Sequence, residues 1–173
     1  MSNPGQSNSA PIENRDQLVE TLARGCKPRA EWKIGTEHEK FGFVLPSRAD
    51  GREPLSPPPY EPQGISALLH ALKGPDWAPI HDGEHLIGLK GEGAQEGRSI
   101  SLEPAGQFEL SGAPVQTLQE TQAEMQEHFD LIRGPASELG LGFSPLGFQP
   151  LWTREAMPWM PKSRYAIMRN YMP

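Results

Sequence analysis

Four glutamates in two short segments are the side chains of this sequence best suited to chemistry. They are Glu37 and Glu39 in KIGTEHEKFGF, and Glu103 and Glu109 in SISLEPAGQFELSG. Residues two apart in a β-strand share a face, with Cα atoms about 7 Å apart. Carboxylates crowded on a packed sheet face repel one another and lose solvation unless a cation lies between them.

A bound divalent metal ion is the simplest counter-charge, and the four glutamates are its predicted ligands. Carboxylate oxygens without nearby Cys or paired His favour the hard cations Mg²⁺ or Mn²⁺ over structural zinc. The alternative is that one end of the sheet face is exposed, so that Glu37 and Glu39 point to solvent. Glu109 by itself would equally suit a surface position at the edge of a strand.

The first part of the chain is predicted to form two helices around one strand. Asn14 caps a short amphipathic helix that ends at Gly25. A strand of about ten residues follows within 31–45, and a loop rich in Pro and Gly occupies 46–62. Apolar residues at helical spacing within 63–74 predict the second helix.

Strands dominate the middle of the chain. A hairpin is expected within 77–91, turning at Asp-Gly, and two more strands within 98–104 and 106–112. One further strand is expected after Gly140, and Pro161 is expected to open a final helix. This order predicts an α+β fold, an antiparallel sheet with flanking helices packed on one face.

A longer helix is predicted between these strands. Thr117 and Glu120 form a capping box at its start. The residues expected to face inward are Leu118, Met125, Phe129 and Ile132, and Pro135 is expected to interrupt or kink the helix.

Composition limits the class of protein. The net charge of −6 and the absence of a run of Lys or Arg argue against a nucleic-acid partner. No apolar run reaches the ~20 residues of a membrane helix, and the N-terminus lacks the pattern of a signal peptide. Together with a single, inert Cys26, these features predict a cytoplasmic protein. Residues 1–10 are expected to be a flexible tail and 11–173 to belong to one domain.

Basic and aromatic side chains gather in the last segment, MPKSRYAIMRNYMP. The guanidinium groups of Arg164 and Arg169 could clamp a carboxylate or phosphate of a substrate, with Tyr165 beside them. A solvated helix face is the alternative. Elsewhere, GEGAQEG lacks the Gly-Lys-Ser/Thr ending of a phosphate-binding loop. His38 lies on the strand face opposite Glu37 and Glu39, which indicates a structural histidine.

Three segments taken together resemble a known family. KIGTEHEKFGF, SISLEPAGQFELSGAP and MPWMPKSRYAIMRNYMP, in this order, are similar to the N-terminal part of glutamate–cysteine ligases of the plant and proteobacterial type. The resemblance runs from about Trp32 to Pro173. Ala105 stands where the family pattern has glycine, a small change at a turn.

The resemblance implies a fold and an activity. The fold would be part of a glutamine synthetase-like catalytic domain, with an incomplete antiparallel sheet whose concave face holds metal ions, ATP and glutamate. The activity would be the ATP-dependent joining of the glutamate γ-carboxylate to cysteine through a γ-glutamyl phosphate, the first step of glutathione synthesis.

The resemblance also implies roles for individual residues. Glu37, Glu39, Glu103 and Glu109 would bind Mg²⁺ or Mn²⁺. Arg164 would contact a substrate carboxylate or the transferred phosphate, with Arg169 and Tyr165 as further substrate contacts. The remaining strands and ligands would lie in a C-terminal part of the same enzyme, so residues 1–173 alone are expected to be inactive or nearly so.

Three other functions stay open at this point. A related ligase could join glutamate to another amine with the same machinery. A non-catalytic module could bind metal or substrate without turnover. A hydrolase could use two glutamates as acid and base, without ATP.

Overall fold

The computed structural model describes residues 10–46 and 54–172. Its helices are α1 (Arg15–Ala23), α2 (Ile65–Leu72), α3 (Leu118–Glu138) and α4 (Ser163–Tyr171). Its strands are β1 (Glu37–Val44), β2 (Trp77–Asp82), β3 (His85–Gly91), β4 (Ser99–Leu102), β5 (Phe108–Ser111) and β6 (Leu141–Ser144). This element order agrees with the sequence prediction. The predicted tail falls on 1–9, outside the described residues except for its last position, and so does the 47–53 part of the predicted loop.

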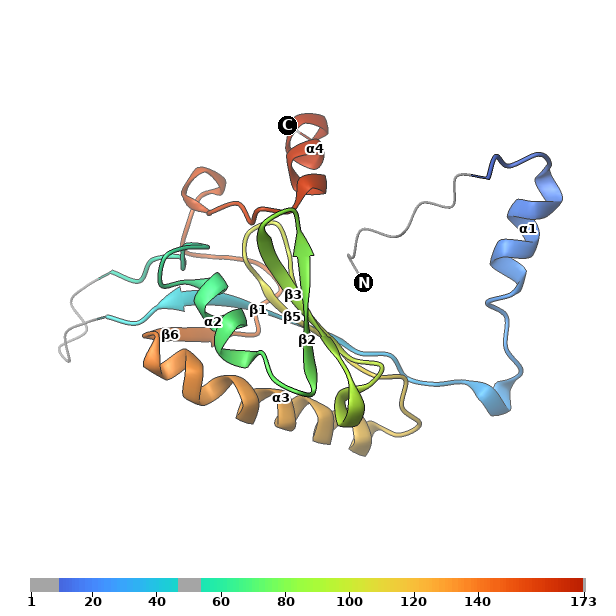
Figure 1. Cartoon of the computed structure of the whole chain (residues 1–173), viewed down its shortest axis with the longest axis horizontal. Coiled ribbons are helices and arrows are strands. Elements are labelled where there is room, and N and C mark those ends of the chain that lie inside the picture. Colours follow the sequence, from blue (N-terminus) through green and yellow to red (C-terminus); the bar gives the residue numbers. More distant parts are fainter. Residues whose placement is uncertain (1–9, 47–53, 173) are drawn as a thin grey trace.

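The six strands form one antiparallel sheet in the order β2-β3-β4-β5-β1-β6. β1 joins two neighbours, because its first half pairs with β5 and its second half pairs with β6. Figure 1 shows β1 crossing the molecule beside β6, with α2 and α3 nearby and α1 standing apart from the sheet. The α+β class with an antiparallel sheet is therefore confirmed.

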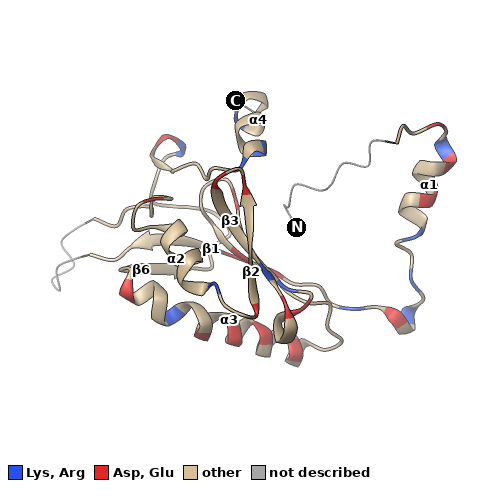
Figure 2. Ribbon diagram, viewed as in Figure 1, with Lys and Arg blue, Asp and Glu red and all other residues tan. Residues whose placement is uncertain are grey.

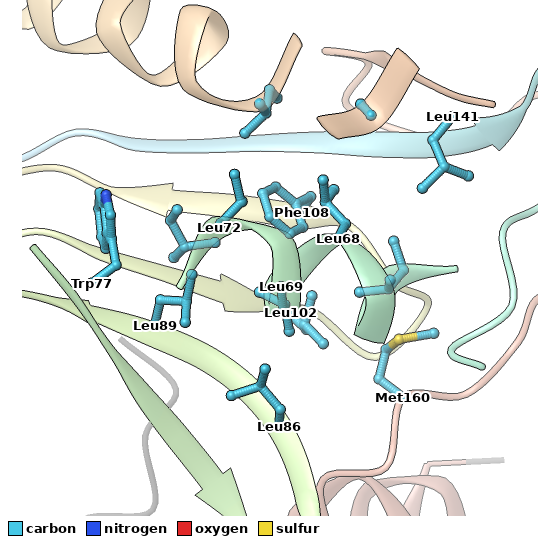
Figure 3. Packing of buried hydrophobic residues seen from close by; sticks show 14 of the residues in the cluster. Leu68, Leu69, Leu72, Trp77, Leu86, Leu89, Leu102, Phe108, Leu141 and Met160 are labelled. Carbon is cyan, nitrogen blue, oxygen red and sulfur yellow. The ribbon is translucent and has the colours of Figure 1, made fainter. Parts of the chain in front are cut away.

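The core lies between the sheet and two helices. Leu68 and Leu69 of α2 are fully buried against Leu89, Leu102 and Phe108 of the strands. Figure 3 shows these side chains meeting between the ribbon of α2 and the strands. Burying side chains of this size contributes about 1.5–3 kcal/mol each, so this layer fixes which face of the sheet is closed and leaves the other for the glutamates.

The predicted cap of α1 is confirmed, but its apolar stripe is not buried. Asn14 accepts a hydrogen bond from the Gln17 amide at 3.0 Å. Leu18, Val19 and Leu22 remain half or more exposed within the described chain. The amphipathic pattern of α1 therefore predicted the helix but not a contact for its apolar side.

The inward face of α3 agrees with the predicted one only in part, since Ile132 is buried and Phe129 packs against the core as expected. Leu118 is 72% exposed, whereas the buried stripe runs through Glu124, His128, Ile132 and Ala136 at a spacing of four residues. The helix also continues past Pro135 to Glu138 instead of ending there. A proline near the end of a helix removes one backbone hydrogen bond, and packing of Ala136 on the core favours the added turn.

Glu124 connects α3 to the sheet, although a carboxylate was not expected in this stripe. Its Oε1 accepts from the backbone amide of Ala113 at 2.7 Å and lies 2.8 Å from Arg98 Nε. The capping box predicted for α3 is also present, since the Glu120 amide donates to the Thr117 hydroxyl and the Thr117 amide donates to the Glu120 carboxylate. The Glu124 contacts place the first turns of α3 against the residues that follow β5.

Replacing Glu124 by alanine should lower the free energy of unfolding by about 3 kcal/mol, because it leaves the Ala113 amide and the Arg98 guanidinium without a buried partner. Urea unfolding monitored by circular dichroism measures this. Glu127→Ala is the matched control, since Glu127 contacts the same Arg98 but its side chain is 58% exposed. That control should cost under about 1 kcal/mol. Equal losses in the two variants would contradict the role of Glu124.

Candidate functional site

Three of the four glutamates meet at one end of the sheet. Glu39, Glu103 and Glu109 each offer a carboxylate oxygen, and these oxygens lie within 4.8 Å of one another. They are the only such group of three or more potential metal ligands among residues 10–46 and 54–172. Glu39 is exposed, Glu103 is half-buried and Glu109 is buried, so the group opens from the sheet toward solvent. We call these three residues the carboxylate group.

Strand register brings the carboxylate group together. Glu39 of β1 is the direct cross-strand partner of Glu109 of β5. Side chains of directly opposed residues project from the same face with Cβ atoms about 5 Å apart. Such a pair of like charges is unfavourable without a cation, so the register itself creates the need for one.

Glu103 reaches the group from the turn between β4 and β5. Its amide donates to the Gln107 carbonyl at 3.0 Å, and its carbonyl accepts from the Gly106 amide at 2.9 Å. Gly106 has φ of +80°, a conformation that favours glycine, and a Cβ there would lie 3.0 Å from Met160. The turn also leaves Gln107 able to donate to Glu39 Oε2 at 3.2 Å.

Glu109 is held as a buried carboxylate by two serines. The Ser101 hydroxyl donates to its Oε2 and the Ser111 hydroxyl to its Oε1, each at 2.6 Å. Burial raises the pKa of Glu109, but these two hydrogen bonds outweigh burial and hold the pKa below its ordinary value. The carboxylate is therefore ionised and fixed in orientation at neutral pH, as a metal ligand must be.

Glu37 does not belong to the carboxylate group. It lies at the start of β1, opposite Ser111, and is exposed. Strand periodicity correctly put it on the same face as Glu39, but the oxygen atoms that approach one another come from Glu39 and the two later glutamates. The described geometry thus brings together three of the four predicted ligands, and metal binding by all four stays a prediction.

The other face of β1 carries a basic cluster that the sequence did not reveal. Lys40 is fully buried, and its Nζ lies 3.0 Å from His38 Nδ1 and donates to the His38 carbonyl at 3.0 Å. The His38 ring contacts the Phe129 ring edge-on, at 5.3 Å between centroids. The prediction that His38 is structural is therefore confirmed. Burial lowers the pKa of Lys40 to about 8.

The start of α4 lies against the end of the sheet where β2 ends at Asp82 and β4 ends at Leu102 (Figure 2). The Ser163 amide donates to Asp82 Oδ2 at 2.7 Å, and the Tyr165 hydroxyl donates to the Leu102 carbonyl. Lys162 Nζ donates to that carbonyl as well, at 2.6 Å. Burial lowers the pKa of Lys162 to about 8, and the charge of Glu103 opposes this effect.

The three predicted substrate contacts on α4 have different surroundings. Arg164 is half-buried, and within the described part of the chain its Nε is a buried donor with no hydrogen-bond partner. Its guanidinium carbon lies 5.1 Å from the centroid of the Tyr165 ring, so the ring supports the guanidinium. Arg169 instead lies over Trp159, at 4.9 Å. Arg164 is thus the candidate clamp, and Tyr165 is its support.

An apolar cavity of about 330 Å³ adjoins the carboxylate group. Phe41 of β1, Pro104 and Gln107 of the β4–β5 turn, and Trp152 and Trp159 of the segment before α4 form much of its wall. A molecule in this cavity would contact Gln107, whose side-chain amide donates to Glu39 of the carboxylate group. An apolar cavity with polar groups at one side is the usual form of a small-molecule site.

Residues 33–173 match the model of the glutamate-cysteine ligase family 2. Among curated proteins, the chain is 49% identical over 164 residues to the chloroplastic glutamate--cysteine ligase of Medicago truncatula, covering 94% of this chain and 30% of the relative. The chloroplastic enzymes of Brassica juncea and Arabidopsis thaliana are each 48% identical over 160 residues, covering 92% of this chain. The chain spans under a third of the length of these relatives.

These relatives also correct one prediction. Each is named as a chloroplastic protein, which contradicts the cytoplasmic location predicted from the sequence. That prediction rested on the single cysteine and on the lack of a membrane-length apolar run and of a signal-peptide pattern, and none of these features separates the cytoplasm from a plastid. No helix within the described ranges is both long enough and apolar enough to span a membrane.

Proposed function

Because this chain belongs to the glutamate-cysteine ligase family 2, we propose that it supplies the N-terminal part of the catalytic domain of an ATP-dependent ligase that joins glutamate to cysteine. In this proposal, residues 11–173 contribute strands and ligands to a larger sheet of the glutamine synthetase type, and a C-terminal part completes it. The carboxylate group is the observation that carries the proposal.

The donor set of the carboxylate group fits a hard divalent cation. Three oxygen ligands at one point, one of them fixed by two serine hydroxyls, suit Mg²⁺ or Mn²⁺, which keep further positions for water or phosphate oxygens. Such an ion, when bound, would neutralise negative charge on a nucleoside triphosphate and on the phosphoryl group that is transferred. Glu39, Glu103 and Glu109 would hold it.

The reaction proceeds in two displacements. An oxygen of the glutamate γ-carboxylate attacks the terminal phosphorus of ATP, the bond from that phosphorus to the bridging oxygen breaks, and ADP leaves. The cysteine nitrogen then attacks the γ-carbonyl carbon, the carbon–oxygen bond to phosphate breaks, and the nitrogen gives up its proton as the amide forms. Two anions must approach one another in the first step, so this chemistry requires cationic groups at the site.

Arg164 and the apolar cavity provide substrate contacts for this chemistry. The unpartnered Nε of Arg164 can donate to a carboxylate or to a phosphate oxygen, and a guanidinium can form two parallel hydrogen bonds with either. The cavity beside Glu39 has room for the uncharged part of a substrate. Tyr165 holds the Arg164 guanidinium and is itself fixed on the Leu102 carbonyl.

A chimera tests the proposal. The chain replaces the corresponding N-terminal segment of the Medicago truncatula enzyme, and phosphate release is measured with ATP, Mg²⁺, glutamate and cysteine. We expect activity, and we expect Arg164→Ala to lower kcat/KM about 100-fold, because a buried bidentate contact to an anion is lost. Arg169→Ala is the matched control and should change kcat/KM by less than about threefold, since its guanidinium lies on Trp159.

The same assay separates the alternatives. Faster turnover with another amine than with cysteine would assign a different acceptor, and turnover without ATP would assign a hydrolase. A folded chimera without any activity would contradict the ligase proposal. The isolated chain should release little or no phosphate.

A further inference from the structure

Lys162 lies at the end of β4, beside Glu103 of the carboxylate group, although nothing in the sequence pattern separates it from other basic residues of the last segment. It is the residue before α4 and is only 3% exposed. Its Nζ donates at 2.6 Å to the carbonyl of Leu102, the residue immediately before Glu103. Leu102 pairs with Phe108, the residue immediately before Glu109. The ammonium is therefore anchored on the peptide unit that precedes Glu103, next to the strand that carries Glu109.

The nearest opposite charges belong to the carboxylate group and to β2. Glu103, Glu109 and Asp82 all attract the ammonium of Lys162, and Arg164 repels it. Glu109 in turn is stabilised as an anion by Lys162, after its two serine hydrogen bonds. An ammonium placed among carboxylates in a buried position interacts with them more strongly than it would in water.

We propose that Lys162 is a built-in counter-ion of the carboxylate group, which balances part of its charge and thereby limits its affinity for a divalent cation. The inference rests on the proposed metal site. The three carboxylates carry three negative charges. The ammonium of Lys162 offsets part of this charge, and Lys40 attracts Glu39 and Glu109 from the other face of β1. A group without Lys162 would keep more negative charge and bind a divalent ion more tightly.

This arrangement suits a site that must exchange its ion together with a nucleotide. A bare group of three carboxylates would retain a divalent cation between turnovers. An ammonium that stays in place lowers this affinity, and the phosphate oxygens of the nucleotide supply the missing ligands when the nucleotide arrives. By this inference Lys162 is a positioning residue that sets metal affinity through charge.

The test is Mn²⁺ binding to the whole chain at pH 7, measured by calorimetry, for the wild type and Lys162→Met. We expect Lys162→Met to bind Mn²⁺ about tenfold more tightly, which corresponds to about 1.4 kcal/mol, within the range of coupling between charged sites. Lys162→Arg keeps the charge and should bind Mn²⁺ within about twofold of the wild type.

Tyr165→Phe is the control for a purely structural role. It removes the other donor to the Leu102 carbonyl without changing any charge, so it should lower the melting temperature while Mn²⁺ affinity stays within about twofold. A folded Lys162→Met protein that binds Mn²⁺ as weakly as the wild type, or more weakly, would overturn the inference and leave the metal site standing. Absence of binding in the wild type and in Lys162→Met alike would overturn both.

A second measurement, an NMR titration, uses only the wild-type protein and so does not depend on whether a variant folds. In the wild type, the ¹³Cε resonance of Lys162 should shift during a Mg²⁺ titration with the same midpoint as metal binding. If Lys162→Met does not fold, an unchanged resonance at saturating Mg²⁺ would overturn the inference by itself.

Discussion

Replacing Glu109 by glutamine should weaken Mn²⁺ binding at least about 100-fold in a calorimetric titration of the chain at pH 7. The reason is that Glu109 is the buried and most rigid member of the carboxylate group, with one hydrogen bond from a serine on each oxygen. Glutamine keeps the shape but removes the charge and replaces one oxygen by an amide nitrogen that cannot bind a cation. Carboxylates fixed by hydrogen bonds are the ligands whose loss costs most, because no other group can move into their place.

Glu37→Gln is the matched control for that experiment. Glu37 lies on the same strand face as Glu39 but outside the carboxylate group, so its replacement should change Mn²⁺ affinity by less than about threefold. A loss with Glu37→Gln as large as that with Glu109→Gln would favour the site of four glutamates that the sequence suggested. Unchanged binding in Glu109→Gln would contradict a metal site at this position. Circular dichroism of both variants shows whether each remains folded.

The strand face could be predicted from the sequence because it depends on a period of two residues. Glu37 and Glu39 fall on one face whatever β1 pairs with. The strand register could not be predicted in this way, because the direct pairing of Glu39 with Glu109 depends on a partner strand about 70 residues away. Glu103 reaches the group only because Gly106 closes the turn in a conformation that few other residues adopt.

The buried polar residues could not be predicted because burial was assigned to apolar side chains. In α3 the apolar Leu118 is exposed, while Glu124 and His128 take places in the buried stripe. Their burial depends on partners from other elements, such as the Ala113 amide for Glu124 and the stacked Phe108 ring for His128. The burial of Lys40 and Lys162 could not be predicted for the same reason, since it depends on contacts with the Phe129 ring of α3 and with the Leu102 carbonyl of β4.

The free energy of unfolding should fall by about 2 kcal/mol between pH 7.5 and pH 5 because of His128 alone. His128 is 3% exposed and stacks on Phe108 at 6.0 Å between ring centroids, and neither ring nitrogen has a hydrogen-bond partner among residues 10–46 and 54–172. Burial, together with the nearby charge of Lys40, lowers its pKa to about 3. The unfolded chain, with an ordinary pKa near 6.5, binds the proton first as the pH falls. The stabilisation is therefore complete above about pH 6.5 and is lost progressively toward pH 3.

His128→Phe should remove this part of the pH dependence and raise stability at pH 7 by about 1 kcal/mol, because two unpaired polar atoms leave the interior while the aromatic stacking stays. Urea unfolding at pH 7.5, 6 and 5 gives the slope for each protein. His38, whose pKa is also lowered by burial, keeps a smaller slope of the same sign in the variant. A His128→Phe protein with the full wild-type slope would mean that His128 takes up its proton in the folded state, and that α3 lies less closely on the sheet than the structure shows.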